Sequence, residues 1–289
     1  MSAAASTSGI QPQVAATAKD PATNIVHKYK VTALDIWALG VTMSAQSLSW
    51  NQGYTAGCVS YTVAAIVIGV AYVLLTQCLG EIMSMMPFSG GAYGLARCTI
   101  GFAAGFFVAA AEIIEYMAYS STAMLSLCTL IVYINPGATI YQPIFWFVGY
   151  LLCLSVHIYG STLFWRVNLF VGILSLTITV LWILGSIAFL DFSASNIPPD
   201  TLYMGGVPGV MKALPSATWL YVGIEALSTA GDDMANPREV VPKGQRYAMY
   251  TLFFTGVTSI MWCSGLPPAI QDMPNVVSTT NSGTTLRSE

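Results

Sequence analysis

Long runs of apolar residues recur along this chain of 289 residues, and they restrict its fold more than any other feature. A helix needs about 20 apolar residues to cross the hydrocarbon core of a bilayer. The chain is 55% hydrophobic and only 8% charged, whereas a soluble domain has about 25% charged residues. We therefore predict an all-α integral membrane protein, a bundle of helices that faces the lipid bilayer. The runs predict seven spans, at residues 34–54, 59–79, 100–134, 141–159, 167–190, 210–231 and 247–266.

Polar segments flank the predicted bundle of residues 31–267. Residues 1–30 lack the charged start and apolar core of a signal peptide, and their composition predicts a disordered cytoplasmic tail. Residues 268–289 are predicted to form a polar C-terminal tail. Within the bundle, the run at 100–134 would be about 50 Å long as one helix. We expect one strongly tilted helix, because that length exceeds the bilayer thickness.

The basic residues indicate how the bundle is oriented. The positive-inside rule places segments rich in lysine and arginine in the cytoplasm. With the N-terminus inside, the opposite side holds Lys212 and Arg287. The cytoplasmic side then holds Lys19, Lys28, Lys30, Arg97, Arg166, Arg238, Lys243 and Arg246. We therefore predict an integral protein of the plasma membrane with a cytoplasmic N-terminus.

The sequence disfavours several classes of function. No basic run indicates a nucleic-acid partner, and no constellation indicates covalent catalysis, so an enzyme is not predicted. No cofactor or metal is predicted, because His27 and His157 are isolated and the six cysteines form no CxxC pair. A seven-helix receptor is an alternative, although its external N-terminus conflicts with the charge distribution. A retinal protein would need a lysine in the last span, and residues 247–266 contain none.

The first predicted span has small and polar residues in its middle, namely Ser44, Ala45, Gln46 and Ser47. Many transporters have discontinuous helices at this depth, whose freed backbone N–H groups bind a carboxylate of the substrate. These four residues are therefore candidates for substrate binding. The alternative, equally supported by this segment, is that their side chains hold neighbouring helices together.

The sixth predicted span is interrupted in a similar way, by Pro215 and by Gly223. Glu225 follows closely, and an ionisable residue inside a membrane is functional by default. It is a candidate proton carrier or partner for a substrate amine, and the alternative is a structural hydrogen bond to an opened backbone. Trp219 and Tyr221 are candidates for an aromatic lid over a substrate, or for plain packing. Interrupted spans in corresponding places of two halves indicate a midplane site in an inverted-repeat transporter.

Glu112 and Glu115 lie three residues apart in the long third run, which places them on one face of a helix. Like charges this close disfavour each other's ionisation. We consider them candidates for proton coupling or for amine recognition. The alternative is that both are protonated and hydrogen-bonded within the bundle.

Together these motifs resemble the amino acid–polyamine–organocation transporters. The resemblance covers roughly residues 30–265 and is carried by residues 87–93, 219–225 and 236–242. Residues 46–51 and 112–116 are most similar to the ethanolamine-permease-like branch. The resemblance implies a five-plus-five inverted repeat with broken first and sixth helices. It also implies secondary transport of amino acids or small amines, often coupled to protons.

The resemblance also implies roles for individual residues. Trp219 would be an aromatic gate, Tyr221 and Gly223 would line the pocket, and Glu225 would couple protonation to transport.

The chain departs from the family pattern in two ways. Residues 44–47 replace the usual glycines of the first break, and the second repeat is only begun. We therefore predict an incomplete transporter, explained by an incomplete gene model, by a splice form or by assembly as a homo-oligomer or with a full-length relative. The alternatives are a non-transporting regulator of a full-length relative and a seven-helix receptor.

Overall fold

A computed structural model of the protein describes residues 29–44, 46, 51–86, 90–193, 197, 202, 205–234 and 236–266. Within these ranges the chain forms helices and no strands, which confirms the predicted all-α class. The α-helices are α1 (Ala33–Met43), α2 (Cys58–Met85), α3 (Gly91–Thr99), α4 (Phe102–Ile134), α5 (Gln142–Ile158), α6 (Ser161–Ser186), α8 (Gly206–Thr218) and α9 (Pro237–Ser264). The 3-10 segments are η1 (Gln52–Ala56), η2 (Pro136–Tyr141), η3 (Ile187–Phe189) and η4 (Ile224–Asp233).

Four helical segments of the described chain are long and apolar enough to cross a membrane. They are α2, α4, η2 together with α5, and α6 extended by η3, and they coincide with four of the predicted spans. α1 and α8 are shorter, with 11 and 13 residues, because each ends at a break. α9 begins with several charged residues and is less apolar. The integral membrane character is thus supported, and the count of seven spans stays a prediction.

α4 is one helix of 33 residues, as predicted for the run at 100–134. It begins at Phe102, after Gly101 adopts a φ of 124° that separates it from α3. Ser121 and Thr122 do not interrupt it, because each hydroxyl donates to the carbonyl four residues earlier at 2.8 Å. The polar groups are therefore satisfied without leaving helical geometry.

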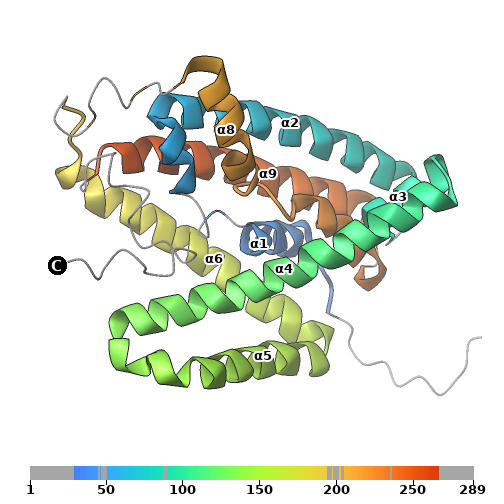
Figure 1. The fold of residues 1–289 in the computed structure, drawn as a ribbon. Helices are drawn as coiled ribbons and strands as arrows, with labels where there is room; N and C mark the ends of the chain where they lie inside the picture. The colour runs from blue at the N-terminus through green and yellow to red at the C-terminus, as the bar shows by residue number, and fades with distance from the viewer. Residues whose placement is uncertain are drawn as a thin grey trace, which may run out of the picture.

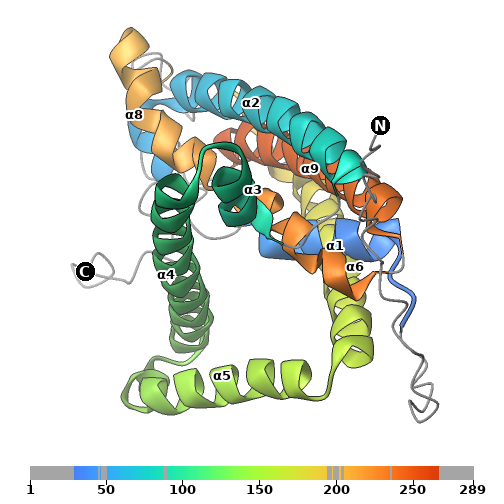
Figure 2. The same cartoon turned by 90° about the vertical axis from the view of Figure 1, so that its right-hand side faces the viewer.

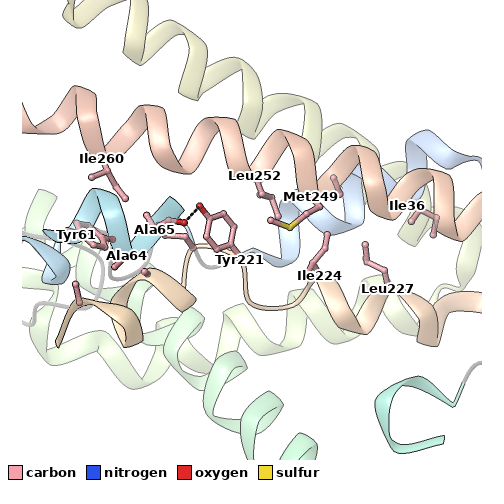
Figure 3. Close-up of a cluster of buried hydrophobic side chains, with 14 of the residues drawn as sticks. Ile36, Tyr61, Ala64, Ala65, Tyr221, Ile224, Leu227, Met249, Leu252 and Ile260 are labelled. Atoms are coloured by element: carbon pink, nitrogen blue, oxygen red, sulfur yellow. Dashed lines mark hydrogen bonds between the residues drawn. The ribbon is translucent and has the colours of Figure 1, made fainter. Parts of the chain in front are cut away.

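The core of the bundle lies where α2, α8, α9, α1 and η4 meet. Figure 1 shows α2 and α9 side by side along much of their length, with α8 against α2. α1 approaches α9 closely at Gly244, where a Cβ atom would lie 2.5 Å from the Ile36 Cβ. Figure 3 shows the buried side chains of this core, which include Ile36, Tyr61, Tyr221, Ile224, Leu227, Met249, Leu252 and Ile260.

α4 and α5 lie at the periphery of the molecule, and α6 joins them to the core, where its Trp165 is buried and its Gly172 packs against Ala38 of α1. Figure 2 shows α4, α5 and α6 as three sides of an open frame beside the core. In α5 the one buried residue is Gly149, whereas its large apolar side chains are mostly exposed. An apolar surface of this extent fits the hydrocarbon region of a bilayer.

Two expected interruptions differ from the structure. Pro215 lies inside α8 without ending it at once, although a proline removes a hydrogen bond of the helical ladder and crowds the preceding turn, and α8 ends soon afterwards at Thr218. Residues 232–244 lie between the sixth and seventh predicted spans and were therefore expected to form a cytoplasmic loop, but α9 already begins at Pro237. Pro237 stands at the start of that helix, where its missing N–H leaves no bond unmade.

Candidate substrate site

The first predicted break is present in the structure. α1 ends at Met43, and Ser44 has an extended backbone with a ψ of 141°. The Ser44 hydroxyl donates to the Val41 carbonyl at 3.0 Å, one of the carbonyls left free where a helix ends. The side chain of Gln46 turns to α9 instead. Ala45 and Ser47, also predicted to bind substrate, lie outside the described residues.

The second predicted break follows the end of α8 at Thr218. Gly223 has a φ of 98° and a ψ of −16°, a conformation that glycine tolerates because it has no Cβ. A Cβ at this position would also lie 3.0 Å from the Met43 carbonyl oxygen. The two breaks therefore meet where Gly223 packs against the end of α1.

Glu225 turns back to this meeting point. Both of its carboxylate oxygens lie 3.1 Å from the backbone nitrogen of Gly223, which donates to them. This N–H is freed by the break, and the half-buried carboxylate caps it. The geometry matches the structural hydrogen bond that the sequence left open as an alternative, and it also positions a titratable group at the break.

Two aromatic residues cover the break on the side of α4. Trp219 stacks on Tyr119, with ring centroids 6.3 Å apart and planes 10° apart. The Tyr119 hydroxyl donates a hydrogen bond to the Met43 carbonyl. Tyr221 lies elsewhere, because it is fully buried and donates to the Ala65 carbonyl of α2 at 3.0 Å (Figure 3). Trp219 is thus placed as a cover, whereas Tyr221 packs in the core.

The glutamates of α4 lie on the same side. Glu112 is half-buried and accepts a hydrogen bond from the Tyr93 backbone, while Glu115 is exposed. Both are close enough to Glu225 to interact with it electrostatically. The structure therefore gathers three predicted carboxylates near the break. In the described part of the chain, no three side chains are grouped as ligands for a metal ion.

A cavity of about 440 Å³ lies between α1, α6 and α9. It is lined by Ser44 and Gln46 of the first break and by Leu220 of the second. Trp219 and the three glutamates do not line it. Of the predicted site residues, Ser44 and Gln46 thus border this cavity, Trp219 and the three glutamates lie at or beside α4, and Tyr221 lies in the core.

Two contributors to the site escaped the sequence predictions. Tyr119 continues the i, i+3, i+4, i+7 series that Glu112, Glu115 and Tyr116 begin, so helical spacing contained a signal for it. Thr255 of α9 contacts Gln46. It gave no signal, because threonines inside membrane helices are common and usually bond their own helix.

The fold and the two meeting breaks define an all-helical integral membrane protein, and comparison with known proteins gives its family. The family model described as "Amino acid permease" matches residues 36–284. The chain therefore belongs to the amino acid permease family. This confirms the resemblance at the level of the family, and the closer likeness to the ethanolamine-permease-like branch stays a prediction.

Three curated relatives are similar to this chain. A putative histidine permease of Bacillus subtilis is 26% identical over 235 residues, which cover 75% of this chain and 48% of the relative. The amino-acid permease GAP5 of Candida albicans is 24% identical, over 85% of this chain and 41% of the relative. The branched-chain amino acid permease BcaP of Bacillus subtilis is 23% identical, over 91% and 59%. The chain spans about half the length of these relatives.

Proposed function

We propose that the protein carries out secondary-active transport of amino acids or small amines across the plasma membrane. The observation that carries this proposal is the contact of the two helix breaks, where Gly223 packs against the Met43 carbonyl. Backbone groups freed at such breaks bind the charged ends of small substrates in the bilayer midplane. The relatives described as histidine and branched-chain amino acid permeases support amino acids as the substrate class.

The proposal assigns roles to the two groups of site residues. The backbone at residues 44–47 binds the substrate carboxylate, and Trp219 with Tyr119 closes the site from the side of α4. Glu225, with Glu112 and Glu115, attracts the substrate amine or relays a proton. A carboxylate at this depth is costly unless it has such a partner. The inverted-repeat fold and the cytoplasmic N-terminus belong to the same proposal.

Uptake into proteoliposomes tests the proposed function. The purified chain is reconstituted, and radiolabelled histidine, leucine and ethanolamine are offered from about pH 5 to about pH 8. Saturable uptake that is absent from empty liposomes is expected. Gly223→Leu serves as the matched inactive variant, because its side chain would collide with the end of α1.

The opposite outcome is equally informative. If correctly inserted protein takes up none of these substrates, the chain does not transport by itself. Co-reconstitution with a full-length relative then separates the remaining alternatives. A change in the relative's uptake rate would indicate a regulator. Uptake that is lost when the site of this chain is mutated would indicate a mixed oligomer in which both chains transport.

A further inference from the structure

Both ends of the Gln46 carboxamide are bonded to α9. Its Nε2 donates to the Leu252 carbonyl at 2.6 Å, and its Oε1 accepts from the Thr255 hydroxyl at 2.9 Å. Each end of the carboxamide thus makes one bond to α9, and one N–H and one oxygen lone pair remain. The bonds join the first break to a helix more than two hundred positions away, with separations of 206 and 209 residues.

α9 is shaped to receive this side chain. A Cβ atom at Gly256 would lie 3.0 Å from the Gln46 Nε2, so a larger residue there would push the carboxamide away. The acceptor, Leu252, keeps its place in the helical ladder, because a carbonyl oxygen has two lone pairs and can accept twice. The contact is therefore built from the backbone of α9 as well as from a side chain.

The same contact can be released at little cost on the side of α9. The Thr255 oxygen also lies 2.8 Å from the Thr251 carbonyl, which can accept its hydrogen when Gln46 departs. The Leu252 carbonyl retains its bond within the helix. Gln46 and Ser44 border the cavity of about 440 Å³, which gives the freed carboxamide space to move into. No buried polar group of α9 is left unsatisfied by the departure.

We propose that Gln46 is a releasable tether that positions the end of α1 against α9. It is a positioning residue and does not itself bind substrate. This inference rests on the proposed function, since the end of α1 is the element to which transport assigns the substrate carboxylate. The tether holds the freed backbone of the break in one place, and its release permits α1 to move relative to α9.

A double-mutant cycle on uptake tests the tether. Gln46→Leu and Thr255→Val each remove the bond between the two side chains, and we expect each to raise KM about threefold to tenfold, with Vmax nearly unchanged. The double variant should resemble Gln46→Leu, because Thr255→Val then has no bond to Gln46 left to remove. Thr255→Ser keeps the hydroxyl and should restore the wild-type KM. Ser259→Ala, in the same cavity wall of α9, is the matched control and should change nothing.

Two results would overturn the inference. If Gln46 binds substrate directly, Gln46→Leu loses affinity while Thr255→Val is silent. If the effects of the two substitutions multiply in the double variant, the residues act independently. Gln46→Met keeps the length of the side chain and loses both polar ends of the carboxamide, so it replaces Gln46→Leu should that variant fail to fold.

Absence of uptake by the wild type would contradict the proposed function, and the tether would still be testable. The wild type, the two single variants and the double variant are then compared by thermal unfolding in detergent. Non-additive shifts of Tm for Gln46→Leu and Thr255→Val support the tether, and additive shifts contradict it.

Discussion

Glu225 forms its two described side-chain hydrogen bonds with the N–H of Gly223, only two residues earlier in the chain. An ionised carboxylate suits this place, because it accepts from a backbone group that the break has freed. Protonation would leave one good acceptor oxygen and add a donor. Binding or loss of one proton at this residue therefore changes the hydrogen bonding of the break itself.

Replacing Glu225 by glutamine separates these two roles. Glu225→Gln keeps an acceptor oxygen for the Gly223 N–H but can neither bind nor release a proton. We expect substrate binding to remain measurable and the pH dependence of uptake to disappear. Uptake measured from about pH 5 to about pH 8 tests this expectation. Glu239→Gln, at the exposed start of α9, is the control. Unchanged pH dependence in Glu225→Gln would remove this residue from coupling.

Gly223 gives a second prediction at the scale of one residue. Gly223→Ala places a Cβ atom 3.0 Å from the Met43 carbonyl oxygen and demands a φ of 98° from an alanine. We expect the free energy of unfolding to fall by about 1–3 kcal/mol. Thermal unfolding in detergent measures the loss. Gly185→Ala, where a Cβ meets nothing within 4 Å, should leave Tm unchanged or slightly raised. Equal behaviour of the two variants would contradict the strained geometry.

At the scale of elements, small residues decide which helices approach closely. Gly244 lets α9 pass α1, because a Cβ there would lie 2.5 Å from the Ile36 Cβ and 2.7 Å from the Ala33 carbonyl oxygen. Gly40 does the same from the side of α1, against Ala248. Close backbone approach of this kind is how helices associate in a membrane, where lipid and leucine are equally apolar.

Enlarging Gly244 should therefore separate α1 from α9. For Gly244→Val we expect a loss of about 3 kcal/mol or more, because backbone as well as side chain blocks the new atoms. Tm and elution as a single species on size exclusion report the change. Gly185→Val on α6 is the matched control, with open space at its Cβ position. A Tm for Gly244→Val equal to that control would mean that the two helices do not pack as described.

The apolar runs predicted the helices well, since length and composition alone decide whether a segment suits a bilayer. They did not predict where the helices end. Pro215 was expected to interrupt a span, yet α8 continues through it and the change of direction falls at Gly223. A proline removes one bond of a ladder, whereas a positive φ cannot be continued as an α-helix.

The pairing of the site residues was still less predictable. Helical spacing placed Glu112 and Glu115 together, but the burial of Tyr221 and the turn of Gln46 to α9 depend on contacts between distant segments. One sequence alone does not indicate which helices pack against each other. The residues of the two breaks were therefore identified, while their division between α4 and α9 required the structure.

At the scale of the whole molecule, charge predicts orientation. Arg97, Arg166, Arg238 and Lys243 lie in segments assigned to the cytoplasmic side. We expect protease to remove residues 1–24 from inside-out vesicles and to leave them intact in right-side-out vesicles. A tag at the N-terminus detects the cleavage, and detergent-opened vesicles show that the tail is cleavable. Cleavage in right-side-out vesicles would reverse the assigned orientation and favour the receptor-like topology.

The exposure of α5 makes its position depend on the surrounding lipid. In the most apolar stretch of the segment from η2 through α5, 6% of the residues are buried. In the corresponding stretch of α2, 33% are buried. α2 packs against neighbouring helices, whereas the apolar side chains of α5 point outward, where the acyl chains of a bilayer would contact them. The depth and tilt of α5 in the membrane therefore depend on the lipid composition as well as on the sequence. A membrane with longer or shorter acyl chains would shift α5, while α6, which packs against α1, and the core of α2 and α9 stay in place.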